Sequence, residues 1–139
     1  MSRKRENVRQ CKVIRQLIDD NKYTKALELI DAIPLEEVGS LDDLYRYAEL
    51  YEKAERMDKK KEIFYHIYHR THSRYMLNRL LRLTIRMGDM EEARELYFAY
   101  EVAGPITLDT FELRYLLAKA EGEPPERLIQ ILEELSDTL

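Results

Sequence analysis

Cysteine is nearly absent from the sequence. The single cysteine, Cys11, has no second thiol with which to form a disulfide, and one thiolate cannot build a cysteine cage around a metal. Glycine and proline are also scarce, with 4 of each in 139 residues, too few turn formers for a sandwich of many short strands. Charged residues make up 36% and apolar residues 45% of the chain, so we expect a folded, all-α protein.

Long apolar runs are missing as well. No stretch approaches the roughly 20 apolar residues that a helix needs to cross a bilayer. The N-terminus, MSRKRENVRQ, is basic and has no apolar segment of the kind found in secretory signals. We therefore expect a cytoplasmic protein that does not enter a membrane. The chain also lacks a Gly-rich phosphate loop and a nucleophile elbow, which favours a protein that is not an enzyme and has no catalytic residue and no cofactor.

One pattern recurs along the chain. Residues 85–100, IRMGDMEEARELYFAY, read as a helix end, a Gly-Asp turn and a second helix, because the apolar residues recur at helical spacing. Similar stretches begin near residues 21, 57 and 121. Taking Asn21, Asp58, Gly88 and Gly122 as equivalent turn residues gives spacings of 37, 30 and 34, with a mean close to 34. This period predicts an array of helix pairs.

The array consists of four predicted antiparallel hairpins in a single domain, residues 1–139. Ser40 is expected to cap the helix that follows it, because its hydroxyl can accept a hydrogen bond from a first-turn N–H group. Pro34, Pro105, Pro124 and Pro125 lie between predicted helices or at their starts, where a missing N–H group costs little. The predicted hairpins are 4–33, 41–70, 73–103 and 108–138, with helices 4–20 and 23–33, 41–56 and 59–70, 73–87 and 90–103, 108–121 and 124–138.

The third hairpin resembles a tetratricopeptide repeat. The turn, small residue, aromatic residue and final proline of that family are matched by Gly88, Asp89, Ala93, Tyr97 and Pro105. The first hairpin offers Tyr23, Ala26, Ile30 and Pro34, while Asp58 and Ile63 in the second hairpin and Arg127 in the fourth depart from the pattern. The resemblance implies a right-handed α-solenoid whose concave face, lined by the first helix of each hairpin, binds a peptide or a partner helix. A pentatricopeptide-like array of helical hairpins is an alternative.

The resemblance also indicates which residues would contact a protein partner. Tyr45 and Tyr75 occupy corresponding outward positions on the concave side of the expected solenoid. Along the first helix of the third hairpin, Asn78, Arg79, Arg82 and Arg86 continue the stripe that begins at Tyr75. A second interpretation of the arginines is an ion-pair ladder, because Glu49, Glu52 and Glu55 precede Arg79, Arg82 and Arg86 by 30, 30 and 31 residues.

Metal binding and RNA binding are two alternative functions. His66 and His69 lie one turn apart on a predicted helix, near enough to share a metal, but they lack the i, i+4 spacing and the glutamate of the zinc-protease motif. A helical repeat that binds RNA is the other alternative, suggested by basic residues near the N-terminus: Arg3, Lys4, Arg5, Arg9, Lys12 and Arg15. Against nucleic acid, the net charge of the chain is −4.

The charge is divided unevenly along the chain. Residues 1–88 carry 19 Lys/Arg and 14 Asp/Glu, whereas residues 89–139 carry 4 and 13. The halves can therefore attract other copies head to tail. The last predicted helix, PERLIQILEELSDTL, has Leu128, Ile131, Leu132 and Leu135 on one side, so we expect that either the native chain continues or copies associate through this helix as a homo-oligomer.

Overall fold

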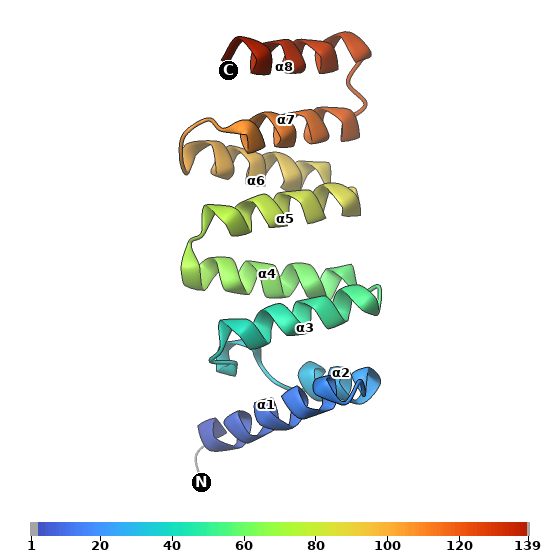
Figure 1. The fold of residues 1–139 in the computed structure, drawn as a ribbon, viewed down its shortest axis with the longest axis vertical. Coiled ribbons are helices and arrows are strands. Elements are labelled where there is room, and N and C mark those ends of the chain that lie inside the picture. The colour runs from blue at the N-terminus through green and yellow to red at the C-terminus, as the bar shows by residue number, and fades with distance from the viewer. Residues whose placement is uncertain (1–2, 139) are drawn as a thin grey trace. The chain divides into compact units, whose positions relative to one another are not determined.

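Every regular element that the structure describes is helical. The computed structural model describes residues 3–138, which confirms the all-α prediction over that range. The helices are α1 (Arg3–Asp19), α2 (Tyr23–Asp31), α3 (Leu41–Lys53), α4 (Met57–Thr71), α5 (Arg74–Met87), α6 (Met90–Val102), α7 (Leu108–Ala120) and α8 (Pro125–Thr138), with a short 3-10 helix, η1 (Leu35–Glu37), between α2 and α3 (Figure 1). Predicted and observed helix ends differ by no more than three residues. The chain divides into two compact units, Met1–Thr71 and His72–Leu139.

The first unit consists of two helix pairs, α1 with α2 and α3 with α4. α2 also packs against α3, and η1 packs against α4. The helices turn apolar stripes toward one another, and the fully buried side chains include Ile14, Leu44, Tyr47, Phe64 and Ile67. Each such side chain contributes about 1.5–3 kcal/mol relative to an exposed one, so the stability of this unit depends on helix pairing.

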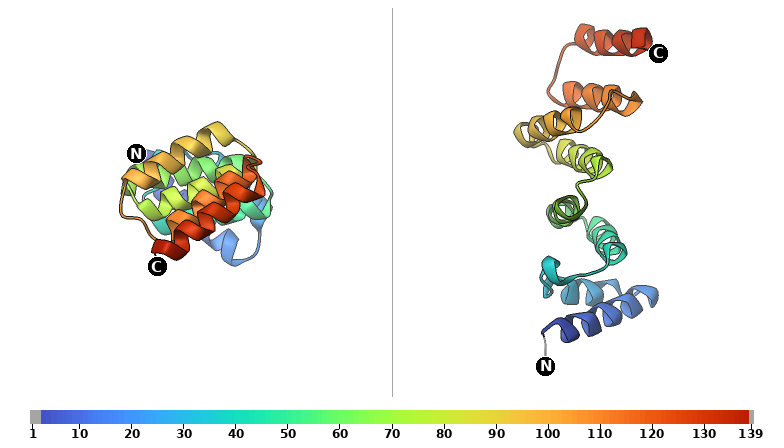
Figure 2. Two further views of the ribbon diagram at one scale, coloured as in Figure 1. Left: turned by 90° about the horizontal axis from the view of Figure 1, so that it is seen from above. Right: turned by 90° about the vertical axis from the view of Figure 1, so that its left-hand side faces the viewer.

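The second unit is likewise built from two pairs, α5 with α6 and α7 with α8. α7 packs against both α5 and α6, while α8 runs beside α7 (Figures 1 and 2). Met76, Leu80, Leu81, Leu113 and Ile131 are fully buried between these helices. α8 therefore contributes its Ile131 to a core that is shared by the unit.

Polar side chains cap several of the described helices at their start, and one of these caps is predicted from the sequence. The Ser40 hydroxyl accepts a hydrogen bond from the Asp43 N–H at 3.3 Å, which confirms Ser40 as the cap of α3. Ser73 caps α5 in the same way, and Asp89 caps α6. No helix among the described residues has the length and apolar composition needed to cross a membrane.

Each hairpin turns through one residue whose backbone is left-handed. These residues are Asn21, Glu55, Gly88 and Gly122, with φ of 60°, 60°, 83° and 76°. At every turn, the N–H group of this residue bonds to the carbonyl three residues earlier, and the next N–H group bonds to the carbonyl five before it, over 2.8–3.3 Å. This pair of hydrogen bonds is the Schellman motif, which ends a helix by satisfying its last carbonyl groups.

The left-handed residues correct the position of the second turn. The sequence pattern puts Asp58 there, but Asp58 lies in the first turn of α4, and the left-handed residue is Glu55. The spacings between turns become 34, 33 and 34 residues in place of 37, 30 and 34. The period looked irregular in the sequence because the second turn was assigned to the wrong residue. Glycine and asparagine are the residues that usually adopt the left-handed conformation, and here a glutamate adopts it.

The corrected register places a lysine inside the second hairpin. Five residues after the turn, where the first and third hairpins have Ala26 and Ala93, the second has Lys60 and not Ile63. Lys60 is 7% exposed, and its ammonium group lies 2.9 Å from Glu52 Oε1 at the end of α3. The Glu52 carboxylate therefore compensates the buried charge of Lys60. Without it, the unpaired ammonium group would cost several kcal/mol of stability.

Exchanging residues at the turns tests the left-handed geometry. Glu55→Gly is expected to raise the free energy of unfolding by about 0.5–1 kcal/mol, because it removes the steric cost of a side chain at positive φ. Gly88→Ala should lower it by about 1 kcal/mol for the opposite reason. Asn21→Gly is the control, with a smaller gain, since asparagine tolerates this conformation. Urea unfolding measures all three, and a loss of stability in Glu55→Gly would contradict the assignment.

Removing either partner of the Lys60–Glu52 pair is expected to have unequal effects. Glu52→Ala leaves a buried ammonium without its carboxylate and should cost about 2–4 kcal/mol of unfolding free energy. Lys60→Met keeps the apolar stem and removes the charge, so its effect should stay within about 1 kcal/mol. Thermal unfolding of both variants measures the two losses of stability. Equal losses would show that the ion pair itself, and not the burial of an unpaired charge, determines the effect.

Candidate functional site

An exposed aromatic and basic stripe runs along α5. Tyr75 is 63% exposed, although its side chain is large and aromatic. The Arg79 guanidinium lies over the Tyr75 ring, 5.8 Å from its centroid, in the geometry of a cation–π contact. Arg86 is exposed further along the same helix. Tyr75, Arg79 and Arg86 therefore present a surface on which a partner can lie.

Arg82 is held in one orientation within this stripe. Its Nε donates to the Asn78 side-chain oxygen at 2.6 Å, and its Nη1 donates to Glu112 Oε1 on α7 at 2.9 Å. The hydrogen bond and charge of Arg82 lower the pKa of the Glu112 carboxyl group. Arg82 remains 34% exposed along its side chain, so its guanidinium is positioned without being covered. A fixed guanidinium loses less side-chain entropy when it binds a ligand.

Asn78, which the sequence predicts as a partner contact, is nearly buried. It is only 9% exposed, and its amide oxygen accepts a hydrogen bond from Arg82. Helical spacing places Asn78 on the stripe, but it does not reveal the cover supplied by neighbouring side chains. We therefore revise Asn78 from a contact residue to a residue that positions Arg82.

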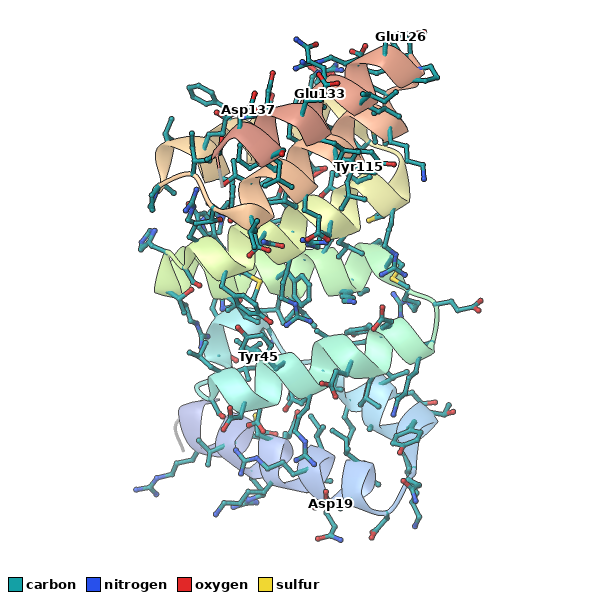
Figure 3. All side chains as sticks on the ribbon, turned by 45° about the horizontal axis from the view of Figure 1, so that its top comes forward. Asp19, Tyr45, Tyr115, Glu126, Glu133 and Asp137 are labelled. Carbon is teal, nitrogen blue, oxygen red and sulfur yellow. The ribbon has the colours of Figure 1, made fainter. Side chains whose placement is uncertain are left out.

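Glu112 and two neighbours extend the surface onto α7. Glu112, Tyr115 and Lys119 follow one another at spacings of three and four residues, so they share one side of the helix. Tyr115 is half-buried and lies on α7 in Figure 3. None of the three is among the contact residues predicted from the sequence. One signal was present, because Glu112 lies one 34-residue period after Asn78.

Tyr45 belongs to the first unit, on α3. Its side chain is half-buried, and Figure 3 labels it on α3. Near it in sequence, Asp43 is 3% exposed and accepts two hydrogen bonds from Arg15 on α1, at 2.8 and 2.7 Å. These bonds raise the pKa of Arg15. Arg46 and Asp19, 3.0 Å apart, form a second link between α1 and α3.

Glu52 and Arg82, which the ladder interpretation pairs with each other, each have another charged partner. Arg82 pairs with the carboxylate of Glu112 in the second unit, and Glu52 pairs with the ammonium group of Lys60 in the first unit.

A cleft of about 530 Å³ opens in the first unit between the end of α2, the segment leading into η1, and α4. It is lined by Ile30, Asp31, Ala32, Ile33, Pro34, Leu35, Glu36, Tyr51, Lys59, Glu62, Ile63, Tyr65, His66 and His69. The Tyr51 hydroxyl donates a hydrogen bond to the Asp31 carboxylate, and burial together with this bond raises the pKa of Tyr51. The phenol therefore stays protonated and acts as a donor.

The two histidines that suggest a metal both line this cleft. The His66 Nε2 atom is buried and has no hydrogen-bond partner among the described residues, while the exposed His69 stacks with Tyr65 at 6.3 Å between ring centroids. Burial and the nearby Arg70 lower the pKa of His66, against a weaker effect of Glu36. Over residues 3–138, no three His, Cys, Asp or Glu side chains converge in a way that could hold a metal ion. His72 adopts a left-handed backbone, φ 51°, in the turn after α4.

The lowered pKa of His66 predicts a pH-dependent stability. In the unfolded chain a histidine titrates near 6.5, and the folded protein accepts that proton only at lower pH. Its contribution is therefore complete above pH 6.5 and is lost as the pH falls below that value. Urea unfolding between pH 7.5 and 5 should show that His66→Gln weakens this dependence, with the exposed His69→Gln as control. A dependence that is unchanged in His66→Gln would contradict the role of this residue.

The resemblance to tetratricopeptide repeats rests on features of the chain itself. Comparison with protein-family models, with curated proteins and with solved structures finds no match.

Proposed function

We propose that the chain is a protein-interaction scaffold without catalysis, built as a right-handed, tetratricopeptide-like solenoid of four helical hairpins. Its support is the repeated turn, with the same left-handed residue and the same two hydrogen bonds at intervals of 34, 33 and 34 residues. Proteins built from such repeats use the surface of successive first helices to bind extended or helical segments.

The observation that carries the proposal is the exposed Tyr75 beside arginines of restricted orientation. A large aromatic side chain that is 63% exposed, next to guanidinium groups, has the composition of a binding hot spot. Arg82 is held by Asn78 and Glu112 before any ligand arrives. The surface is therefore preorganised, which reduces the entropic cost of binding.

The charge of the stripe defines the class of partner. α5 carries Arg74, Arg79, Arg82 and Arg86 and no acidic residue. A protein segment that pairs carboxylates with Arg79 and Arg86 and places an apolar or aromatic side chain against Tyr75 satisfies both features. Tyr45 on α3 is proposed as a further contact with a protein segment.

Selection from a library of random peptides tests this function, because it samples many sequences at once. Wild-type protein is expected to enrich acidic peptides with an aromatic or apolar residue, and calorimetry should show that the double variant Tyr75→Ala, Arg79→Ala binds them at least tenfold more weakly, a loss of about 1.4 kcal/mol.

Phe98→Ala is the matched control, because Phe98 is an equally exposed aromatic residue on α6, at 69%. It should leave the affinity unchanged. Enrichment of no peptide, or equal binding by the Tyr75/Arg79 variant, would refute the proposal. Single-stranded RNA that binds the same stripe near physiological salt, in place of peptide, would support the nucleic-acid alternative instead.

A further inference from the structure

The outer side of α8 combines exposed apolar side chains with carboxylates. Ile131 is fully buried, whereas Ile129 and Leu132 on the same helix are 54% and 52% exposed. Three acidic residues, Glu126, Glu133 and Asp137, are also exposed, and Figure 3 shows them spread along the side of α8 turned away from α7. An apolar pair beside a row of like charges is typical of a surface that binds a partner of opposite charge.

α1 presents a complementary surface. Arg5, Arg9 and Lys12 are exposed on this helix, together with Val8 at 52% and Val13 at 46%. Val13 and Arg9, with Glu6 and Gln10, line a shallow hollow of about 280 Å³. Arg3 and Lys4 belong to the same basic group in the sequence, but their side chains are not among those that the structure describes. The outer side of α1 is thus basic, with valines beside the charges.

Some exposed charges on α1 and α8 differ in their pairing from several arginines of the protein. Arg46, Arg82, Arg94 and Arg114 each form an ion pair with a carboxylate of their own unit. Within the described part of the chain, no ion pair involves Arg9 or Lys12 on α1, or Glu126, Glu133 or Asp137 on α8. These side chains remain available to groups from another molecule.

The spacing of the charges also matches. Arg9 and Lys12 are three residues apart on α1, and Glu133 and Asp137 are four residues apart on α8. Three or four residues correspond to about one turn of a helix, so both pairs can form at once between helices that lie side by side.

We propose that α8 of one copy binds α1 of a second copy, with carboxylates against basic residues and with Ile129 and Leu132 against Val8 and Val13. The contact is heterologous, because the two surfaces differ, so each copy has one surface of each kind available for another copy. Several ion pairs near solvent make the association weak and strongly dependent on salt. This inference concerns self-association and is independent of the peptide site on α5.

Charge reversal on each helix tests the assignment. The wild-type protein is expected to increase in mass with concentration in light scattering at low salt, and to do so less at high salt. Two triple variants, Glu126→Lys, Glu133→Lys, Asp137→Lys on α8 and Arg5→Glu, Arg9→Glu, Lys12→Glu on α1, should each associate at least about tenfold more weakly. An equimolar mixture of the two variants should associate again, because the two unchanged surfaces can meet each other and the two reversed surfaces complement each other.

The matched control is Glu91→Lys, Glu95→Lys, Glu123→Lys, which reverses three exposed acids elsewhere in the second unit. It should associate like the wild type, and far-UV circular dichroism checks that every variant remains helical. A wild-type protein that stays monomeric at all concentrations at low salt would overturn the proposal. So would association that neither triple variant weakens, or variants that fail to associate when mixed.

Discussion

Each hairpin depends on one backbone constraint, the reversal of the chain through a single residue with positive φ. A helix can pair with its successor only if the chain turns back within a few residues and still satisfies the last carbonyl groups. The two hydrogen bonds around Asn21, Glu55, Gly88 and Gly122 meet both conditions. Pairing then buries apolar stripes that neither helix can cover alone, and each unit acquires its core from two such pairs.

The helices were predictable because their signals are local. Apolar spacing, a serine cap and the positions of proline and glycine are all read within one turn of the residue concerned, and the resulting helix ends agree within three residues. The second turn was misplaced because Glu55 has none of the chemistry that marks a left-handed residue. Its conformation is imposed by the pairing of α3 with α4, which is a tertiary effect. The burial of Lys60 was unpredictable for the same reason, since it is explained only by a carboxylate eight residues earlier on another helix.

The candidate site could be predicted only in outline. Helical spacing places Tyr75, Asn78, Arg79, Arg82 and Arg86 along one side of α5, because that follows from the period of a helix alone. It could not show that Asn78 is covered or that Glu112 meets Arg82, since both depend on how α7 packs against α5. The cleft beside α4 had no signal in the sequence, because its lining comes from segments separated by about thirty residues.

The distribution of charge in the second unit limits what its basic stripe can bind. The four arginines of α5 face an excess of acid on the following segments, where residues 89–139 carry 13 Asp/Glu and 4 Lys/Arg. Arg82, Arg94 and Arg114 each neutralise one of those carboxylates, and most of the others remain exposed. An acidic ligand on α5 would therefore be attracted by its nearest arginines and repelled by the carboxylates of the following segments, over the screening length of roughly 8 Å at physiological salt. For the proposed peptide site, this balance would favour a short acidic segment that contacts α5 directly over a long acidic chain that also crosses α6 to α8.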